Sequence, residues 1–259
     1  MPHAVFALWM REIVKFVRDR SRLVGALAQP LGFWVLLGLG FKGTFRMPVE
    51  SAADVSYMEF LFPGILALIL LFTAIFSTIS IVEERKSGFL QAALVAPVSR
   101  TTLVLGNALG GTTLAVAEAL LFLLLLPFVG LTPTAAGLLI IVATAFMTGI
   151  GFTALGVAIA WRMETTRGFH AVMNLFLLPL WFLSGSFFPA EGAPALLQWL
   201  VRLNPVSYAV GAMRQGLYWP HASPLPTAPV AMSLLVTLGF AAAMLALAVY
   251  TVRRPLYGR

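Results

Sequence analysis

The sequence of 259 residues contains no cysteine and few charged residues, which make up only 10% of the chain. The absence of cysteine excludes disulfides, thiolate metal sites and a cysteine nucleophile. A soluble domain typically has about a quarter of its residues charged, whereas here 60% are hydrophobic and the mean hydropathy is +0.93. A chain of this length cannot bury so much apolar surface in a core of its own. We therefore expect an integral membrane protein.

Several motifs that carry chemistry are also missing. The sequence has no Gly-x-x-x-x-Gly-Lys-Ser/Thr loop for nucleotide phosphates. It has neither a His-Glu-x-x-His zinc motif nor the paired acidic motifs that hold magnesium-bound diphosphate. Ser184 and His170 belong to one predicted helix several turns apart, too far for a Ser–His pair. We expect no catalytic residue and no metal site, and a polytopic membrane enzyme remains an alternative reading only.

Apolar runs of membrane-spanning length recur along the whole chain. A bilayer core about 30 Å thick needs roughly 20 apolar residues in a helix. The sequence thus predicts an all-α membrane protein with one domain, residues 1–259, and six spans at about 23–41, 60–82, 103–129, 135–161, 169–188 and 228–252.

The net charge of +7 lies in short groups between the apolar runs, which argues against a nucleic-acid partner. Of the 17 Lys and Arg residues, only four fall in the two longer connections on one side of the membrane. The others fall in the N-terminal segment, the loops after spans two and four, and the C-terminal tail. Cytoplasmic segments are the ones enriched in Lys and Arg. Both termini should therefore be cytoplasmic, with the first span acting as the insertion signal.

Residues 5–22 have the pattern of an amphipathic helix. Apolar residues recur at spacings of three and four from Phe6 to Val17, and Arg11, Lys15, Arg18 and Arg22 line the opposite face. Such a helix lies in the cytoplasmic membrane interface, with its cations near anionic headgroups. It could be a simple anchor or a surface that contacts a partner subunit.

The loop after the second span, "IVEERKSGFLQAALVAPVSR", is more elaborate than a return loop needs to be. Four charged residues, Glu83–Lys86, come in a row, and Ser87–Gly88 permits a sharp change of direction. Phe89–Ala96 suits a two-turn helix that Pro97 then ends. The pattern favours a docking element over a plain charged cap.

The long connection after the fifth span, Pro189–Thr227, contains two short amphipathic stretches. "PALLQWLVRL" and "NPVSYAVGAMRQGLYW" predict two helices at or dipping into the outer interface. Trp199, Tyr208, Tyr218 and Trp219 would be their headgroup-level aromatics. An inert outer cap would show the same pattern.

Glu118 falls near the middle of the third span, where a carboxylate is costly and usually faces the interior of a helix bundle. It could belong to a substrate or proton pathway, or be a buried acid that is hydrogen-bonded to a neighbouring helix. It is the one feature that supports an ion-coupled secondary transporter as an alternative. In the fourth span, Ala145, Gly149 and Thr153 have the small-xxx-small spacing that allows close helix packing.

Three segments resemble the permease subunits of type-2 ABC (ATP-binding cassette) exporters, especially those of drugs, lipo-oligosaccharides and polysaccharides. They are "FLFPGILALILLFTAIFSTISIVEERKSGFLQAALVAPVSR", "MNLFLLPLWFLSGSFFP" and "LNPVSYAVGAMR". The resemblance implies that the loop is a coupling helix which docks on a cytoplasmic ATPase. The contact would be formed by Glu83, Glu84, Arg85, Lys86, Ser87, Gly88, Leu90 and Pro97, with a second contact through Arg11, Lys15 and Arg18 of the N-terminal helix.

The resemblance also implies the assembly and its task. The chain would pair with a second permease copy, as a homodimer, and with two copies of an ATPase subunit that carries the ATP–Mg. It would reside in the bacterial cytoplasmic membrane and export an amphipathic or hydrophobic compound or a glycoconjugate. In the family the fifth span lies near the dimer centre, which adds Asn174, Phe176, Trp181 and Phe182 of that span to the candidate substrate pathway. Glu118 of the third span is the other candidate pathway residue, for the reason given above.

Overall fold

The computed structural model describes residues 2–18, 20–41, 55–88, 99–190 and 193–254. Within these ranges the elements are all helices, as predicted. They are α1 (Pro2–Arg18), α2 (Arg20–Gly40), α3 (Tyr57–Ser77), α4 (Ile79–Lys86), α6 (Arg100–Leu123), η2 (Leu126–Val129), α7 (Ala135–Ala160), α8 (Thr166–Trp181), η3 (Phe182–Ser186), α9 (Ala195–Leu203), α10 (Pro205–Tyr218) and α11 (Val230–Arg253).

Five helical stretches in the described ranges are long and apolar enough to cross a membrane. They are Tyr57–Lys86, Arg100–Leu123, Ala135–Ala160, Thr166–Ser186 and Val230–Arg253. They correspond to predicted spans two to six. At the predicted first span, α2 has a shorter apolar stretch, Leu27–Gly40.

The third span ends earlier than predicted. Its helix stops at Leu123 and is followed by the 3₁₀ helix η2, rather than continuing to residue 129. Pro127 lies within η2, where it cannot donate a helical hydrogen bond. Gly130 then adopts a left-handed backbone with φ of 74°, which ends the segment.

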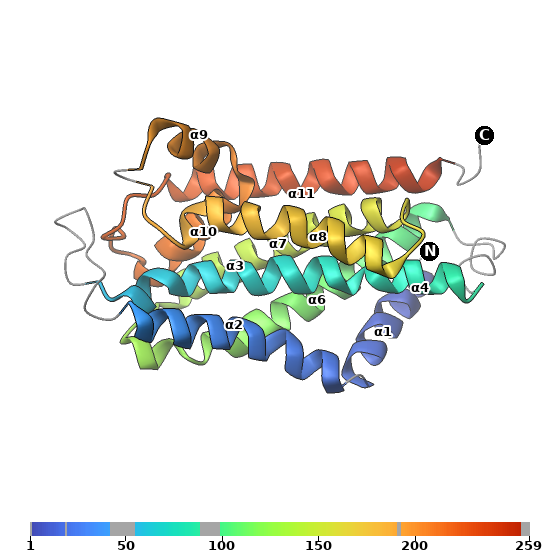
Figure 1. Ribbon diagram of the computed structural model, residues 1–259, viewed down its shortest axis with the longest axis horizontal. Coiled ribbons are helices and arrows are strands. Elements are labelled where there is room, and N and C mark those ends of the chain that lie inside the picture. The colour runs from blue at the N-terminus through green and yellow to red at the C-terminus, as the bar shows by residue number, and fades with distance from the viewer. Residues whose placement is uncertain (1, 19, 42–54, 89–98, 191–192, 255–259) are drawn as a thin grey trace.

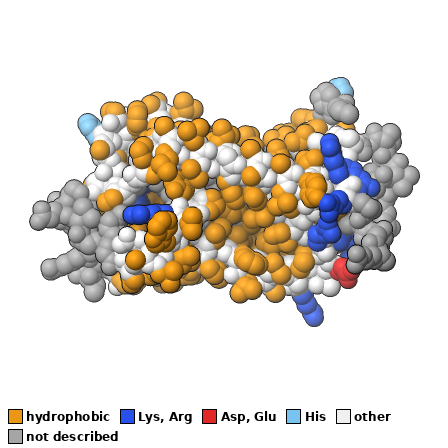
Figure 2. All heavy atoms as spheres, turned by 90° about the horizontal axis from the view of Figure 1, so that it is seen from above, with side chains coloured by type: hydrophobic (Ala, Val, Ile, Leu, Met, Phe, Trp, Pro, Cys, Tyr) orange, Lys and Arg blue, Asp and Glu red, His pale blue; other side chains and the backbone are white. Residues whose placement is uncertain are grey.

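The long helices lie side by side along the long axis of the molecule (Figure 1). The N-terminus, α4 and the C-terminal end of α11 are at one end, and α9 and α10 are at the other (Figure 1). Hydrophobic side chains cover the middle of the visible face, and most of its Lys and Arg side chains gather at the end with the termini (Figure 2). This segregation of charge matches the pattern seen in the sequence.

Helix α3 forms the centre of the bundle. Almost all of its side chains are buried, and those of Leu61, Phe62, Ile65 and Leu70 have no exposed surface. It packs against α2, α6 and α7. A helix enclosed by protein in this way needs apolar residues all around rather than a stripe, which its composition provides.

Small residues let α7 approach α6 closely. A Cβ atom added to Gly149 would lie 2.9 Å from Thr112 Cγ2, and one added to Gly111 would lie 2.7 Å from Thr153 Cγ2. Both approaches are closer than ordinary side-chain contacts, so these glycines are what the packing needs. The small-xxx-small spacing of span four thus serves the close packing predicted for it.

Helix α1 is amphipathic, as predicted, but ends at Arg18, and Arg20 and Arg22 belong to α2. Its apolar stripe points away from the protein, since Phe6, Met10, Val14 and Val17 are exposed. The side that carries Glu12 is buried against the bundle. The face of α1 that carries Glu12 and Phe16 therefore meets other helices, and the apolar stripe from Phe6 to Val17 is exposed.

Helices α9 and α10 occur where the sequence predicts them. α9 is exposed, as shown by Leu196, Trp199 and Leu203. α10, however, is not a surface helix, because most of its side chains are buried against α7, α11 and α3. It can enter the bundle because a Cβ added to Gly137 of α7 would lie only 2.2 Å from the carbonyl oxygen of Gly216. This backbone contact is not evident from an amphipathic pattern.

Candidate functional site

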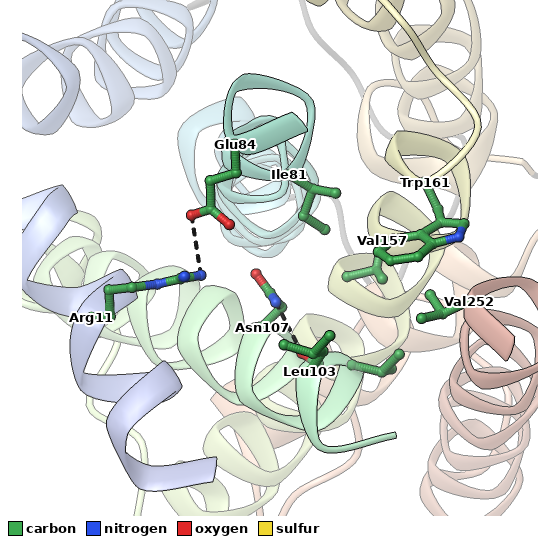
Figure 3. A pocket seen from close by; sticks show the side chains of 9 residues that line it. Arg11, Ile81, Glu84, Leu103, Asn107, Val157, Trp161 and Val252 are labelled. Atoms are coloured by element: carbon green, nitrogen blue, oxygen red, sulfur yellow. Dashed lines mark hydrogen bonds and ion pairs between the residues drawn. The ribbon is translucent and has the colours of Figure 1, made fainter. Parts of the chain in front are cut away.

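An ion cluster joins α1 to α4 at the end of the molecule that holds the termini. Glu84 of α4 is 8% exposed and its Oε1 lies 3.1 Å from Arg11 Nη2. Lys15 Nζ forms a second ion pair with the same oxygen. Arg11 and Lys15 are one helical turn apart, so α1 presents both cations to one carboxylate. Figure 3 shows Arg11 reaching from α1 towards Glu84 beside Ile81 and Asn107.

A second carboxylate lies buried beside this cluster. Glu12 is 5% exposed, and its Oε1 lies 2.7 Å from Arg11 Nη2. Its Oε2 accepts a hydrogen bond of 3.2 Å from the Ser80 hydroxyl. A Cβ at Gly110 of α6 would lie 2.7 Å from Glu12 Cβ, so the glycine makes room for the acid. The cluster therefore ties α1 to both α4 and α6.

Arg85 joins α4 to the end of α7. Its Nη1 donates to the carbonyl oxygen of Met163 at 2.8 Å, and its Nη2 donates to that of Trp161. Both carbonyls come just after Ala160, the last residue of α7, where the end of the helix carries partial negative charge, so a guanidinium suits them well. The guanidinium carbon also lies 6.0 Å from the Trp161 ring centre.

Arg100 makes an equivalent contact with α11. Its Nη1 donates to the carbonyl oxygens of Val252 at 3.0 Å and Arg253 at 3.1 Å. The neighbouring Ser99 caps α6 by accepting a hydrogen bond of 3.1 Å from the Thr102 amide. Arg85 and Arg100 thus flank the segment 89–98, and each is bonded to the C-terminal end of a different spanning helix.

The residues implied to contact an ATPase fall into two groups. Arg11, Lys15, Glu84 and Arg85 are engaged with other helices of this chain. Exposed groups at the same end are Glu83, Lys86, Ser87 and Arg18. Gly88 has a left-handed backbone with φ of 78°, consistent with the predicted sharp turn. Leu90 and Pro97, like the predicted two-turn helix, lie outside the described residues.

A groove of about 510 Å³ runs between α2, α3–α4 and α8, with α1 at one end. Among the predicted pathway residues, Asn174 lines it directly. Glu118 lies just behind its wall, because Thr73, which lines the groove, donates a hydrogen bond to Glu118 Oε2. Glu118 is itself 3% exposed. The hydroxyl of Thr73 therefore separates the groove from the carboxylate.

The other predicted pathway residues are placed differently. Trp181 is fully buried and its indole nitrogen donates to the carbonyl oxygen of Gly64 at 2.7 Å. Phe176 is 64% exposed on the outer side of α8. Phe182 begins η3, at the end of α8 that follows Pro179, and packs on Trp181 with ring centres 5.0 Å apart. None of the three is among the residues that line the groove.

A second cavity, of about 560 Å³, lies at the opposite end between η3, α9, α10 and α11. The buried Arg214 lines it, with its guanidinium carbon 4.9 Å from the Phe60 ring centre and Nη2 3.4 Å from the Gly185 carbonyl oxygen. Nearby, Tyr218 donates to Glu59, and burial raises the pKa of the Tyr218 phenol. Arg214 was not singled out in the sequence because α10 resembles a surface helix there.

This architecture is that of a multi-pass helical membrane protein in which the charged end is tied to the spanning helices by ion pairs and Arg–carbonyl bonds. Comparison with known families identifies it further. The model of the ABC-2 type transporter family matches residues 3–218, most of the chain. The chain belongs to this family of transporter membrane subunits, which confirms the resemblance drawn from the sequence.

Individual relatives agree with the family match. The chain is 28% identical over 222 residues to the ycf38 transport permease of Cyanophora paradoxa, covering 85% of this chain and 75% of the relative. It is 28% identical over 218 residues to nodulation protein J of Rhizobium leguminosarum bv. trifolii, covering 80% and 79%. It is 26% identical over 171 residues to YbhR of Escherichia coli (strain K12), described as a multidrug ABC transporter permease, covering 66% and 46%.

Proposed function

We propose that this chain is the membrane subunit of an ATP-driven exporter, with six spans and both termini in the cytoplasm. A separate ABC ATPase, in two copies, would bind the ATP–Mg, and a second copy of this chain would complete the pathway in a bacterial cytoplasmic membrane. The observation that carries the proposal is the two sets of arginine–carbonyl hydrogen bonds made by Arg85 and Arg100. These bonds hold both flanks of the segment 89–98 to the ends of α7 and α11.

The hydrogen bonds of Arg85 and Arg100 support a route by which movement of the ATPase would reach the spanning helices. An ATPase that docks on segment 89–98 and on exposed Lys86 would push on α4 and α6 together. Arg85 would pass that displacement to the α7–α8 connection, and Arg100 would pass it to α11. The Glu84 ion pairs would carry it to α1. Salt bridges and paired hydrogen bonds from one guanidinium suit this role because they fix the relative orientation of two helices as well as the distance between them.

The groove between α2, α3–α4 and α8 is the proposed cargo pathway. It combines apolar walls with Gln29 and Asn174, a lining suited to an amphipathic molecule or the lipid part of a glycoconjugate. Glu118, behind Thr73, would contribute a carboxylate to it. Movement of α4 and α8 relative to one another would change its width.

The proposal is tested by co-expressing the tagged chain with a candidate ABC ATPase and purifying through this chain alone. We expect the ATPase to co-purify and to show vanadate-sensitive ATP hydrolysis in lipid. Reversing the exposed charge with Lys86→Glu should weaken the association. The matched charge reversal Arg202→Glu, on exposed α9 at the opposite end, should leave it intact. Failure of every candidate ATPase to bind the stable, intact chain would contradict the proposal.

An ion-coupled secondary transporter is the second candidate, favoured only by the buried Glu118 next to the groove. The energy source distinguishes the exporter from the secondary transporter. Uptake of a candidate cargo into inverted vesicles that needs ATP and continues in the presence of a protonophore supports the exporter. Transport that a protonophore stops, and that ATP does not drive, supports the secondary transporter.

A further inference from the structure

The groove described above has an aromatic wall. The rings of Phe72 and Phe76 lie with centres 5.6 Å apart, and the His170 ring lies 5.0 Å from Phe76. Phe16 of α1 adds a further ring near the end of the groove. The faces of aromatic rings carry partial negative charge and attract cations, more strongly where water is excluded. This wall therefore favours a cation over an anion of the same shape.

The charges around the groove point in the same direction. Among the described residues that line it, the one fully charged side chain is Glu83, and none is Lys or Arg. Glu83 is exposed on α4, at the end of the molecule with the termini. Glu118 stands at the other side of Thr73, deeper in the bundle. A positive group moving from Glu83 towards Thr73 would thus travel between two carboxylates.

From this combination we propose that the groove selects amphipathic cations, in which an apolar body carries an ammonium or similar positive group. The inference rests on the proposed function for the groove's role as a pathway, and it adds the charge class of the cargo. The apolar body packs on Leu68 and the phenylalanine rings. The positive group is held by Thr73–Glu118 and by the amides of Gln29 and Asn174. An anion of equal size meets two carboxylates and no matching cation on the described lining.

Two ions of nearly the same size and shape and of opposite charge test this directly. The full-length chain is placed in nanodiscs of zwitterionic phosphatidylcholine, and binding of tetraphenylphosphonium and of tetraphenylborate is measured by equilibrium dialysis against empty nanodiscs. We expect saturable binding of the phosphonium and none of the borate. Comparison with empty nanodiscs removes the contribution of partition into lipid.

Variants locate the site. Glu118→Gln should weaken phosphonium binding about tenfold, since losing a low-dielectric charge partner costs on the order of 1.4 kcal/mol or more. Glu83→Gln should weaken it about threefold, because this exposed carboxylate is screened by water. Phe76→Leu should weaken it about threefold through the lost ring face. Glu164→Gln removes the same charge from an exposed acid outside the groove and should change nothing.

The outcomes are distinct. Equal binding of phosphonium and borate, or phosphonium binding that Glu118→Gln, Glu83→Gln and Phe76→Leu all leave unchanged, overturns the inference. Phe76→Leu changes no charge, so it still tests whether the phosphonium binds in the groove if Glu118→Gln or Glu83→Gln fails to fold. If the ATPase co-purifies with the chain but the chain does not bind the phosphonium, the cationic cargo class is refuted and the exporter function is not. Groove-dependent binding by a chain that associates with no ATPase instead refutes the exporter and leaves the charge class standing.

Discussion

Lys15 of α1 and Glu84 of α4 form an ion pair although 69 residues separate them in the sequence. The carboxylate is nearly buried, whereas the side chain of Lys15 is 43% exposed. Arg11 completes the contact from one turn away. The pair therefore fixes the rotation of α1 relative to α4, and with it the direction in which the exposed apolar stripe of α1 points.

Removing the carboxylate with Glu84→Gln should destabilise the protein by about 2 kcal/mol, between the values for exposed and buried ion pairs. Two cations would then face each other without the acid that joins them. Glu83→Gln, an exposed neighbour, should change stability by less than about 0.5 kcal/mol. Thermal unfolding in detergent, followed by size-exclusion fluorescence, measures both. Equal effects of the two variants would show that the cluster does not stabilise the fold.

Arg85→Lys should loosen the joint between α4 and the α7–α8 connection while keeping the charge. A guanidinium can donate to two carbonyls at once, whereas an ammonium is a single point of charge. Because the chain has no cysteine, spin labels can be attached at Lys86→Cys and Glu164→Cys without background. We expect the distance distribution between them to broaden in Arg85→Lys. Arg254→Lys, in the exposed C-terminal region, should leave it as narrow as in the parent.

Gly88→Ala should impair the turn that ends α4, because an L-residue at φ of 78° costs about 1–2 kcal/mol. Asparagine tolerates this region better, so Gly88→Asn should be milder. The readout is the amount of ATPase that co-purifies with each variant. We expect a several-fold loss for alanine and a smaller loss for asparagine. The reverse order would mean that the backbone conformation of this turn does not govern docking.

Much of the fold could be predicted because it depends on local sequence. Span length and hydropathy locate the five long helices, and Gly88 marks a turn through its own backbone preference. The close packing of α7 follows from residues spaced one turn apart on a single helix, such as Gly149. In each case the signal lies within about one helix length of the structure it specifies.

The roles of the charged residues could not be predicted in the same way. Glu84 and Arg85 occur in a run of four charges that the sequence assigns to a docking surface, whereas their partners lie on α1 and just after α7 of the same chain. Those partners are far away in sequence, and their meeting depends on how whole helices pack. Arg214 was missed for the same reason, since the burial of α10 depends on the backbone contact between Gly137 and Gly216. Long-range packing determines which charges stay available to a partner protein.

Gly111→Ala should destabilise the bundle by about 1–3 kcal/mol through overpacking. The added Cβ would lie 2.2 Å from Ser77 Oγ and 2.7 Å from Thr153 Cγ2, so these two side chains, or the helices α3 and α7 that carry them, would have to move. Gly239→Ala in α11 is the matched control, because no atom lies within 4 Å of the added Cβ there. It should be neutral or slightly stabilising, since alanine favours helix. Thermal unfolding of the two variants in the same detergent decides the matter.

Thr73→Val and Glu118→Gln test whether the hydroxyl and the carboxylate act as a unit. Interhelical hydrogen bonds inside membrane proteins are worth about 0.6 kcal/mol on average, with a maximum near 1.7 kcal/mol. Because Thr73 donates directly to Glu118, the double variant should lose less stability than the sum of the single variants, by about 1 kcal/mol. Strict additivity would mean that the bond contributes nothing to stability. A coupling of the expected size would establish that Thr73 orients the carboxylate behind the groove wall.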